Sequence, residues 1–98
     1  MYARVTTIQI SPYRVDEAIG VIRDHVVPAA QQQEGFRGFQ MLVDRGTGKS
    51  FAITIWEKEP DRQVSGPNST YYREAIGRIV PLLTDTPITE DVEIVIHV

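Results

Sequence analysis

The chain has no cysteine among its 98 residues. This absence excludes a disulfide framework, a thiolate metal site and a cysteine nucleophile. Basic residues are also few and scattered: 10 lysines and arginines stand against 13 acidic residues, which gives a net charge of −3. Binding to nucleic acid or to an anionic membrane surface requires clustered positive charge, so we expect neither as the main partner.

Long hydrophobic runs are missing as well. No run approaches the roughly 18 apolar residues that a membrane-spanning helix needs, and no basic and apolar leader opens the chain. We therefore expect a cytoplasmic protein. The sequence is long enough for a single domain, residues 1–98, and its 42% share of hydrophobic residues allows a modest core.

The clearest structural pattern lies at residues 36–57. Two runs rich in Phe, Val, Ile and Thr flank a polar loop with two glycines at 45–49, which predicts a β-hairpin whose second strand spans 51–58. The loop resembles a phosphate-binding loop only superficially, because it lacks the full spacing and precedes a strand. We interpret it as a hairpin turn.

Before the hairpin, β-branched residues predict a first strand at 3–10. Apolar residues three and four apart then predict a helix from Tyr13, with Ser11 as its cap. Pro28 must kink or end this helix, because it donates no N–H and its ring clashes with the preceding turn. Gly35 is the expected stop.

After the hairpin, residues 61–64 are expected to form a single helical turn. A second helix follows, capped by Asn68 or Ser69. Residues 84–90 form a polar linker, and the last strand is expected at 91–98. The resulting order, β-α-β-β-α-β, is the ferredoxin-like motif: a four-stranded antiparallel sheet with two helices on one face. The first strand and the second hairpin strand should lie in the centre.

The predicted strands are apolar on both sides, whereas a sheet covered on one face should alternate apolar and polar side chains. Two short helices cover one face only, so the other would expose a large apolar patch. We therefore expect a homodimer through the sheet face. If Phe51, Ile53 and Ile55 face the helices, then Thr54 and Trp56 face the dimer. A pocket between each sheet and its helix is the natural site for a small hydrophobic or aromatic molecule.

Several motifs are similar to those of the antibiotic biosynthesis monooxygenase superfamily, whose members are dimeric α/β-barrel proteins. They are Glu-Gly-Phe-Arg-Gly-Phe at 34–39, Trp-Glu at 56–57 and Ser-Thr-Tyr-Tyr-Arg-Glu-Ala at 69–75. The resemblance covers nearly the whole chain and implies the ferredoxin-like fold. It implies no single activity, because the superfamily includes cofactor-free oxygenases of polyketides and quinols, haem-degrading oxygenases and isomerases.

The haem-degrading branch can be compared residue by residue. Trp56 resembles the tryptophan that presses on the porphyrin in that branch. The branch's asparagine in the first strand falls at or near Thr6, and its iron-binding histidine falls at Ile76. Isoleucine cannot ligate iron, so typical haem degradation is not expected, while haem binding through another ligand stays open.

The candidate general bases are two histidines, His97 and His25. They have neither a histidine partner at helical spacing nor a cluster of carboxylates, so we expect no metal site. His97 would act as a base only if it faces a cavity. The competing interpretation is a surface or hydrogen-bonded histidine near the terminus.

Aromatic and polar side chains are the candidate lining of a ligand pocket. Trp56 could stack on a flat ligand or anchor the core. Tyr71 and Tyr72 could pack or present a hydroxyl, and Gln40 would need a partner if it is buried in its apolar run. The full candidate set comprises Trp56, Tyr71, Tyr72, Gln40, Thr54 and Thr6.

Three functions stay open at this point. The first is a cofactor-independent monooxygenase-like enzyme, in which a bound small aromatic or quinol-type molecule loses a proton and reacts with dioxygen without metal or flavin. The second is a non-catalytic dimer that binds a small hydrophobic molecule, with haem as one option. The third is a dimer whose cavity is filled by side chains. The absence of a convincing base weighs slightly against catalysis.

Overall fold

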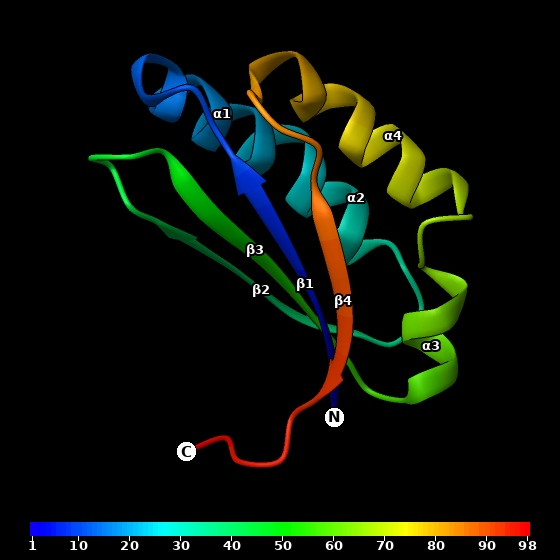
Figure 1. The fold of residues 1–98 in the computed structure, drawn as a ribbon. Helices are drawn as coiled ribbons and strands as arrows, with labels where there is room; N and C mark the ends of the chain where they lie inside the picture. The colour runs from blue at the N-terminus through cyan, green and yellow to red at the C-terminus, as the bar shows by residue number, and fades with distance from the viewer.

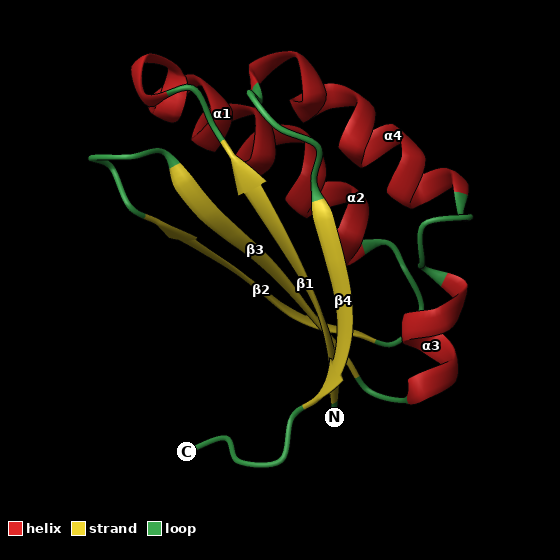
Figure 2. Cartoon of the chain, in the orientation of Figure 1, coloured by secondary structure: helices red, strands yellow, loops and turns green.

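The computed structural model describes residues 1–98, which form one sheet and a layer of helices (Figures 1 and 2). The strands are β1 (Tyr2–Gln9), β2 (Phe36–Val43), β3 (Lys49–Trp56) and β4 (Ile88–Glu93). The helices are α1 (Val15–Val21), α2 (Val27–Gln31), α3 (Glu59–Val64) and α4 (Thr70–Ile79). Short 3-10 turns lie at Pro12–Arg14 and Val80–Leu82, and a π-helical turn lies at Ile22–Val26.

The sheet is antiparallel and has the order β2-β3-β1-β4. Figure 1 shows α1, α2 and α4 on one side of it, with the other face open. The ferredoxin-like architecture and the two central strands are therefore as predicted. No helix combines the length and the hydrophobicity needed to cross a membrane.

The first helical region continues past Pro28, where the sequence predicted a kink or an end. A π-helical turn directly precedes the proline, and the Val27 N–H bonds to the Ile22 carbonyl five residues earlier. This wider turn accommodates a residue that has no N–H of its own. The predicted Ser11 cap is also corrected: its side chain makes no capping bond, and its carbonyl accepts from the Arg14 N–H at 2.8 Å.

The helix also ends before Gly35, the stop expected from the sequence: α2 ends at Gln31, with Gln32 as its C-cap. Gly35 lies in the turn that follows and has a φ of 78°, a conformation that glycine adopts at little cost. Ser69 caps α4, because its Oγ accepts from the Tyr72 N–H at 3.1 Å. The short helix expected at 61–64 begins two residues earlier, at Glu59, because Pro60 fits a first helical turn, where no N–H is needed.

The last strand differs from the prediction of 91–98. It spans Ile88–Glu93, so part of the expected polar linker is strand and the final residues are not. β4 pairs with β1 from Thr7 back to Tyr2, and one further bond joins the Ile94 N–H to the Met1 carbonyl.

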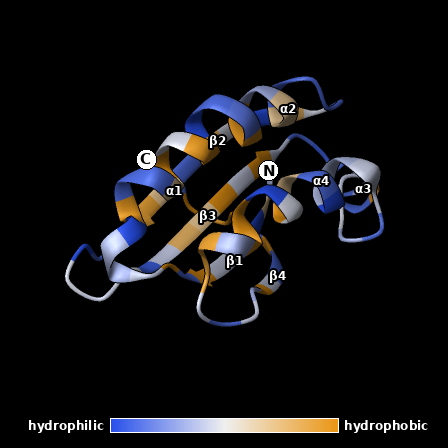
Figure 3. Ribbon diagram, turned by 90° about the horizontal axis from the view of Figure 1, so that it is seen from above, coloured by the Kyte–Doolittle hydropathy of each residue, from blue (hydrophilic) through white to orange (hydrophobic).

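The hydrophobic core lies between the sheet and the helices, which carry hydrophobic stretches that alternate with hydrophilic ones (Figure 3). Its buried members are Ile8, Ile10, Val15, Ala18, Ile22, Val26, Ile79 and Leu82. On β3, Thr54 and Trp56 face this helix side and are 8% and 0% exposed. Their neighbours Phe51, Ile53 and Ile55 lie on the open face, the reverse of the arrangement considered from the sequence.

A buried guanidinium joins β1, β4 and the end of α3. Arg4 on β1 is 3% exposed. Its Nε and Nη2 donate to Asp91 on β4 at 3.0 and 3.4 Å. Its Nη1 donates to the carbonyl and hydroxyl of Ser65 at 2.9 and 3.3 Å, and Nη2 also donates to the Arg62 carbonyl at 2.7 Å. All five N–H groups of this side chain are thus engaged.

Replacing Arg4 should therefore destabilise the chain severely. Arg4→Met keeps much of the volume but leaves a carboxylate and two carbonyls without their donor, so we expect a loss of about 3–5 kcal/mol in the free energy of unfolding. Chemical denaturation measures it. The control is Arg23→Met, which removes an arginine that pairs with Asp24 at the exposed surface and should leave stability near that of the parent. Equal losses in the two variants would contradict the assignment.

Candidate functional site

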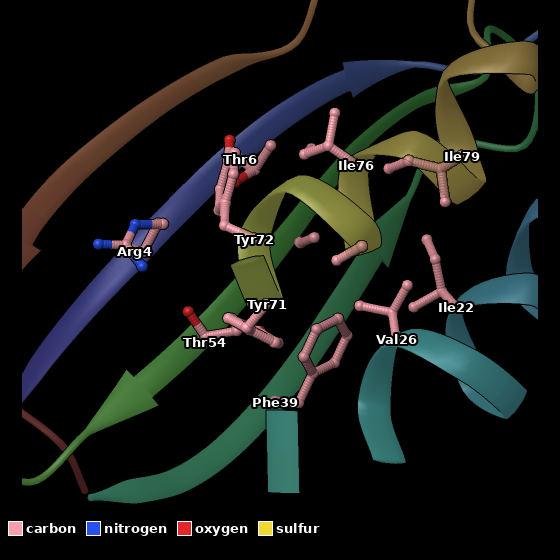
Figure 4. A pocket seen from close by; sticks show the side chains of 12 residues that line it. Arg4, Thr6, Ile22, Val26, Phe39, Thr54, Tyr71, Tyr72, Ile76 and Ile79 are labelled. Atoms are coloured by element: carbon pink, nitrogen blue, oxygen red, sulfur yellow. The ribbon is translucent and has the colours of Figure 1, made fainter. Parts of the chain in front are cut away.

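A cavity of about 50 Å³ lies between the sheet, α4 and the π-helical turn at Ile22–Val26 (Figure 4). The side chains that line it come from β1, β2, β3, the π-helical turn and α4, and nine of the twelve are hydrophobic. They are Arg4, Thr6, Ile22, Val26, Phe39, Ala52, Thr54, Tyr71, Tyr72, Ala75, Ile76 and Ile79. The cavity exists because the β3 side chains below α4 are small, so the helix does not fill the space above the sheet.

One wall of the cavity carries a chain of hydroxyl groups. The Tyr72 hydroxyl forms a hydrogen bond with the hydroxyl of Thr89 on β4. The same Thr89 oxygen lies 3.4 Å from that of Thr6, its cross-strand partner on β1. These two bonds use two of the three hydroxyl protons, so one proton of the group has no acceptor within the protein.

The opposite end of the cavity is built on Trp56. Its Nε1 donates to the Thr54 hydroxyl at 2.9 Å. Its ring packs edge-on against Phe36 at a centroid distance of 6.0 Å and against Tyr71 at 6.4 Å. Such edge-to-face contacts fix ring orientation. Trp56 therefore supports the cavity wall from behind, since it is fully buried and does not line the space itself.

Arg4 borders the cavity as a buried positive charge. Its guanidinium lies 5.8 Å from the centre of the Tyr72 ring, within reach of a cation–π interaction. Because all its N–H groups are bonded within the protein, it acts on the cavity through its charge and not through a directed hydrogen bond. The lining itself holds no carboxylate, but the Arg4 charge is paired with Asp91 at 3.0 Å, and this ion pair reduces the effect of the charge on the cavity.

Tyr71 is a titratable residue of the lining, and its surroundings shift the pKa of its hydroxyl. Burial raises the pKa of its phenol to about 12, while the nearby charge of Arg4 acts in the opposite direction. Its hydroxyl has no hydrogen-bond partner within the protein. At neutral pH it is therefore a protonated hydroxyl and a potential donor to a ligand, and it is not a base.

The structure brings together four of the predicted pocket residues, Thr6, Thr54, Tyr71 and Tyr72. Gln40 lies outside: it is exposed on the open face, because its neighbour Phe39 faces the helices. Arg4 was missed, although an arginine in step with Thr6 and Ile8 along a strand is a signal that could have found it.

Both candidate bases also lie outside the cavity. His25 is exposed on the π-helical turn. His97 is exposed in the segment after β4, where the sequence had placed it in a strand. No group of three or more His, Asp or Glu side chains is arranged to hold a metal ion.

The lining does not fit haem. Ile76 lines the cavity at the position where the haem-degrading branch has its iron ligand, and no imidazole lies elsewhere in the lining. The phenol of Tyr71 is a poor substitute, because its raised pKa opposes the anionic form that would bind iron.

The raised pKa of Tyr71 predicts how stability depends on pH. The folded chain holds this proton more tightly than the unfolded chain, so the stabilisation is present below pH ~10 and is lost as the pH rises toward 12. Between pH 9 and 11.5, we expect the parent to lose about 1–2 kcal/mol more of its unfolding free energy than Tyr71→Phe does. Urea denaturation across this range measures the difference, and parallel curves for the two proteins would refute it.

The amino-acid sequence is similar to those of curated proteins that are described as uncharacterized. No family model matches the chain. An uncharacterized protein of Mycobacterium tuberculosis is 36% identical over 94 residues, which make up 96% of this chain and 41% of that protein. A second uncharacterized protein of the same organism is 46% identical over 57 residues, which are 58% of this chain and 24% of that protein. The chain thus spans less than half the length of the curated relatives that it matches.

Solved structures give the fold. A provisionally named antibiotic biosynthesis monooxygenase from Bordetella bronchiseptica has a TM-score of 0.80 at 14% identity, with 97% of both chains covered. Another from Caulobacter crescentus, also provisionally named, has a TM-score of 0.75 at 17% identity and covers 96% of this chain and 89% of that chain. At these identities the likeness establishes architecture and not activity. The chain has the fold of the antibiotic biosynthesis monooxygenase superfamily.

Proposed function

We propose that the chain is a monooxygenase-like protein that binds a small aromatic or quinol-type molecule in this cavity and lets it react with dioxygen without metal or flavin. The observation that carries the proposal is the cavity itself: a mostly apolar space, bordered by a buried positive charge and by hydroxyl groups, in a fold shared with proteins named antibiotic biosynthesis monooxygenase. An apolar space with a few polar groups is typical of a small-molecule site.

The chemistry requires little of the protein. A quinol-type substrate would react through its keto tautomer, whose activated ring methylene loses a proton, and the resulting anion reacts with dioxygen. The substrate supplies both electrons, so that one oxygen atom enters the product as a carbonyl and the other leaves as water. The residues of this chain would hold the ring and stabilise the anion through the Thr54 and Tyr71 hydroxyls. The proton passes to solvent, since no imidazole or carboxylate lines the cavity.

The same absence of a base favours a second candidate, which is binding without turnover. An enzyme that removes a proton usually places a histidine or carboxylate within hydrogen-bond reach of the substrate. Here both histidines are exposed and lie away from the lining. In this second candidate the cavity holds a small hydrophobic molecule that dissociates unchanged.

For either candidate we propose a homodimer through the open face of the sheet. Large apolar side chains are exposed there: Leu42 is 49% exposed, Ile88 62% and Val92 43%. Val5 and Ile53, a cross-strand pair in the middle of the same face, are half-buried. A second copy that packs the same face against this one would cover the patch with a self-complementary surface.

Oxygen uptake with a panel of quinols separates turnover from binding. Ala75→Leu fills the cavity from α4, so we expect it to abolish uptake and to weaken binding of the active quinol at least about tenfold. The matched control is Gly77→Leu, which places the same side chain on the same helix where an added Cβ meets no atom within 4 Å. It should retain the parent activity.

Each outcome of that comparison decides something. Uptake that survives Ala75→Leu would place any reaction outside this cavity. Saturable binding in the parent without oxygen uptake, abolished by Ala75→Leu alone, would establish the binding candidate in place of the enzyme.

The dimer has its own test. Ile53→Asp introduces a charge into the middle of the open face, and we expect it to raise the dissociation constant of the dimer at least about 100-fold, because a buried unpaired carboxylate is costly. Analytical ultracentrifugation measures the shift. Tyr13→Asp is the control, because Tyr13 is 97% exposed on the 3-10 turn after β1. A parent that sediments as a stable single subunit at micromolar concentration would rule the dimer out.

A further inference from the structure

The hydrogen bond between Trp56 and Thr54 has only one possible direction. An indole Nε1 carries a proton and cannot accept, so the Thr54 Oγ1 must be the acceptor at 2.9 Å. Both side chains are buried, Trp56 at 0% and Thr54 at 8% exposure. This bond uses a lone pair of the Thr54 hydroxyl and leaves its proton uncommitted.

That proton has no acceptor within the protein. Its bond from Trp56 is the only hydrogen bond that the Thr54 side chain makes, whereas the hydroxyls of Thr6, Thr89 and Tyr72 bond to one another. Thr54 lies on the cavity wall (Figure 4). Buried donors in native proteins nearly always find a partner, and an unpaired one indicates a group that occupies the adjacent space.

The rest of the lining offers donors and no dedicated acceptor. It contains no carboxylate, no imidazole and no side-chain amide. The Tyr71 hydroxyl is held in its protonated form by burial. Arg4, the cross-strand partner of Thr54, contributes positive charge from the adjacent strand. The cavity therefore complements an acceptor oxygen on an otherwise apolar ligand.

We propose that the Thr54 hydroxyl anchors a carbonyl-type oxygen of a small aromatic ligand, and that Trp56 is a positioning residue that keeps this hydroxyl turned as a donor toward the cavity. The inference rests on the proposed function, because it names the ligand chemistry of the same site. It also assigns Trp56 a role other than the stacking that its sequence position suggested: the indole acts on the ligand through Thr54.

The probes are acetophenone and ethylbenzene, which share an aromatic ring and differ in the carbonyl oxygen. Trp56 is the only tryptophan, so its indole N–H gives a single resonance in a nitrogen–proton correlation spectrum. We expect acetophenone to bind the parent about five- to tenfold more tightly than ethylbenzene, the gain expected from one satisfied donor. It should also shift the indole resonance more, because a bond donated by Thr54 strengthens the one it accepts.

The variants separate the anchor from simple packing. Thr54→Val keeps the shape without the hydroxyl, so the preference for acetophenone should fall to about one. Thr54→Ser keeps the hydroxyl and should retain the preference. Trp56→Phe leaves the hydroxyl free to turn and should reduce the preference without abolishing ethylbenzene binding. Near-ultraviolet circular dichroism of Thr54→Val and Thr54→Ser verifies that each remains folded.

Several results would overturn the anchor. They are an equal affinity of the parent for the two probes, a preference that survives in Thr54→Val, or a preference that Thr54→Ser loses. If Thr54→Val does not fold, the parent spectrum and the Trp56→Phe and Thr54→Ser titrations still decide. Failure of both probes to bind the parent would count against the proposed function itself, whereas equal binding would remove only the anchor.

Discussion

A buried arginine organises the end of the molecule where the cavity lies. A guanidinium charge that is 3% exposed is tolerable only if every N–H group is bonded and an opposite charge is close. Arg4 meets this condition with groups from two other elements: a carboxylate on β4 and two carbonyls at the end of α3. These partners are far apart in the sequence, so the edge strand and the short helix must both be in place before the charge is satisfied.

This constraint explains why the cavity survives next to a packed core. Toward the hairpin loop, Ile8 of β1 and Ile10 just after it belong to the core, and the helices close over them. Toward its start, β1 presents Arg4 and Thr6, and β3 presents the small side chains Ala52 and Thr54. The Arg4 side chain is held by its hydrogen-bond partners, so it does not pack against α4 as a leucine at the same position could. The space above these residues is therefore held open by polar bonds on its border.

Much of the fold could be predicted from sequence periodicity, because local patterns determine it. The hairpin and the Ser69 cap each depend on a few adjacent residues. The bounds of β4 could not be predicted in this way, because they follow its pairing with residues Tyr2 to Thr7 of β1 and not its own β-branched residues. The π-helical turn before Pro28 could not be predicted either, because a proline in a helix is compatible with a kink, a helix end or a wider turn.

The face of each strand was harder to predict, for a physical reason. When both sides of a strand are apolar, the alternation that normally distinguishes core from solvent is absent. On β3 the large apolar residues Phe51 and Ile53 were expected on the helix side. The residues that lie there are Ala52, Thr54 and Trp56. A register shift in β2 between Phe36 and Gly38 adds a further displacement and brings Phe36 onto Trp56. Such a bulge has no clear signature in a single sequence.

Four of the six pocket residues named from the sequence line the cavity, whereas the hydrogen bonds that organise it were not predicted. These four are Thr6, Thr54, Tyr71 and Tyr72. They could be named from the sequence because polar residues within apolar strands, and aromatic residues at the start of a helix, are unusual. The roles of Trp56 and Arg4 depend on hydrogen-bond partners from other elements, which no spacing rule reveals. The exposed positions of His25 and His97 likewise follow from helix rotation and from strand length.

Arg4 and Thr54 together determine where an oxygen atom of a ligand would lie in the cavity. They are directly paired across β1 and β3, so their side chains lie next to each other on the helix side of the sheet. Arg4 has no N–H group left to donate and contributes charge alone. Thr54 has one proton left and contributes a directed bond. An oxygen placed against Thr54 would therefore accept a hydrogen bond beside the Arg4–Asp91 ion pair, and the Thr54 proton would stabilise negative charge that developed on it. A carbonyl that becomes an enolate, or a quinol that loses its proton, meets this description. The same pair of residues would thus select the ligand and favour its reactive form.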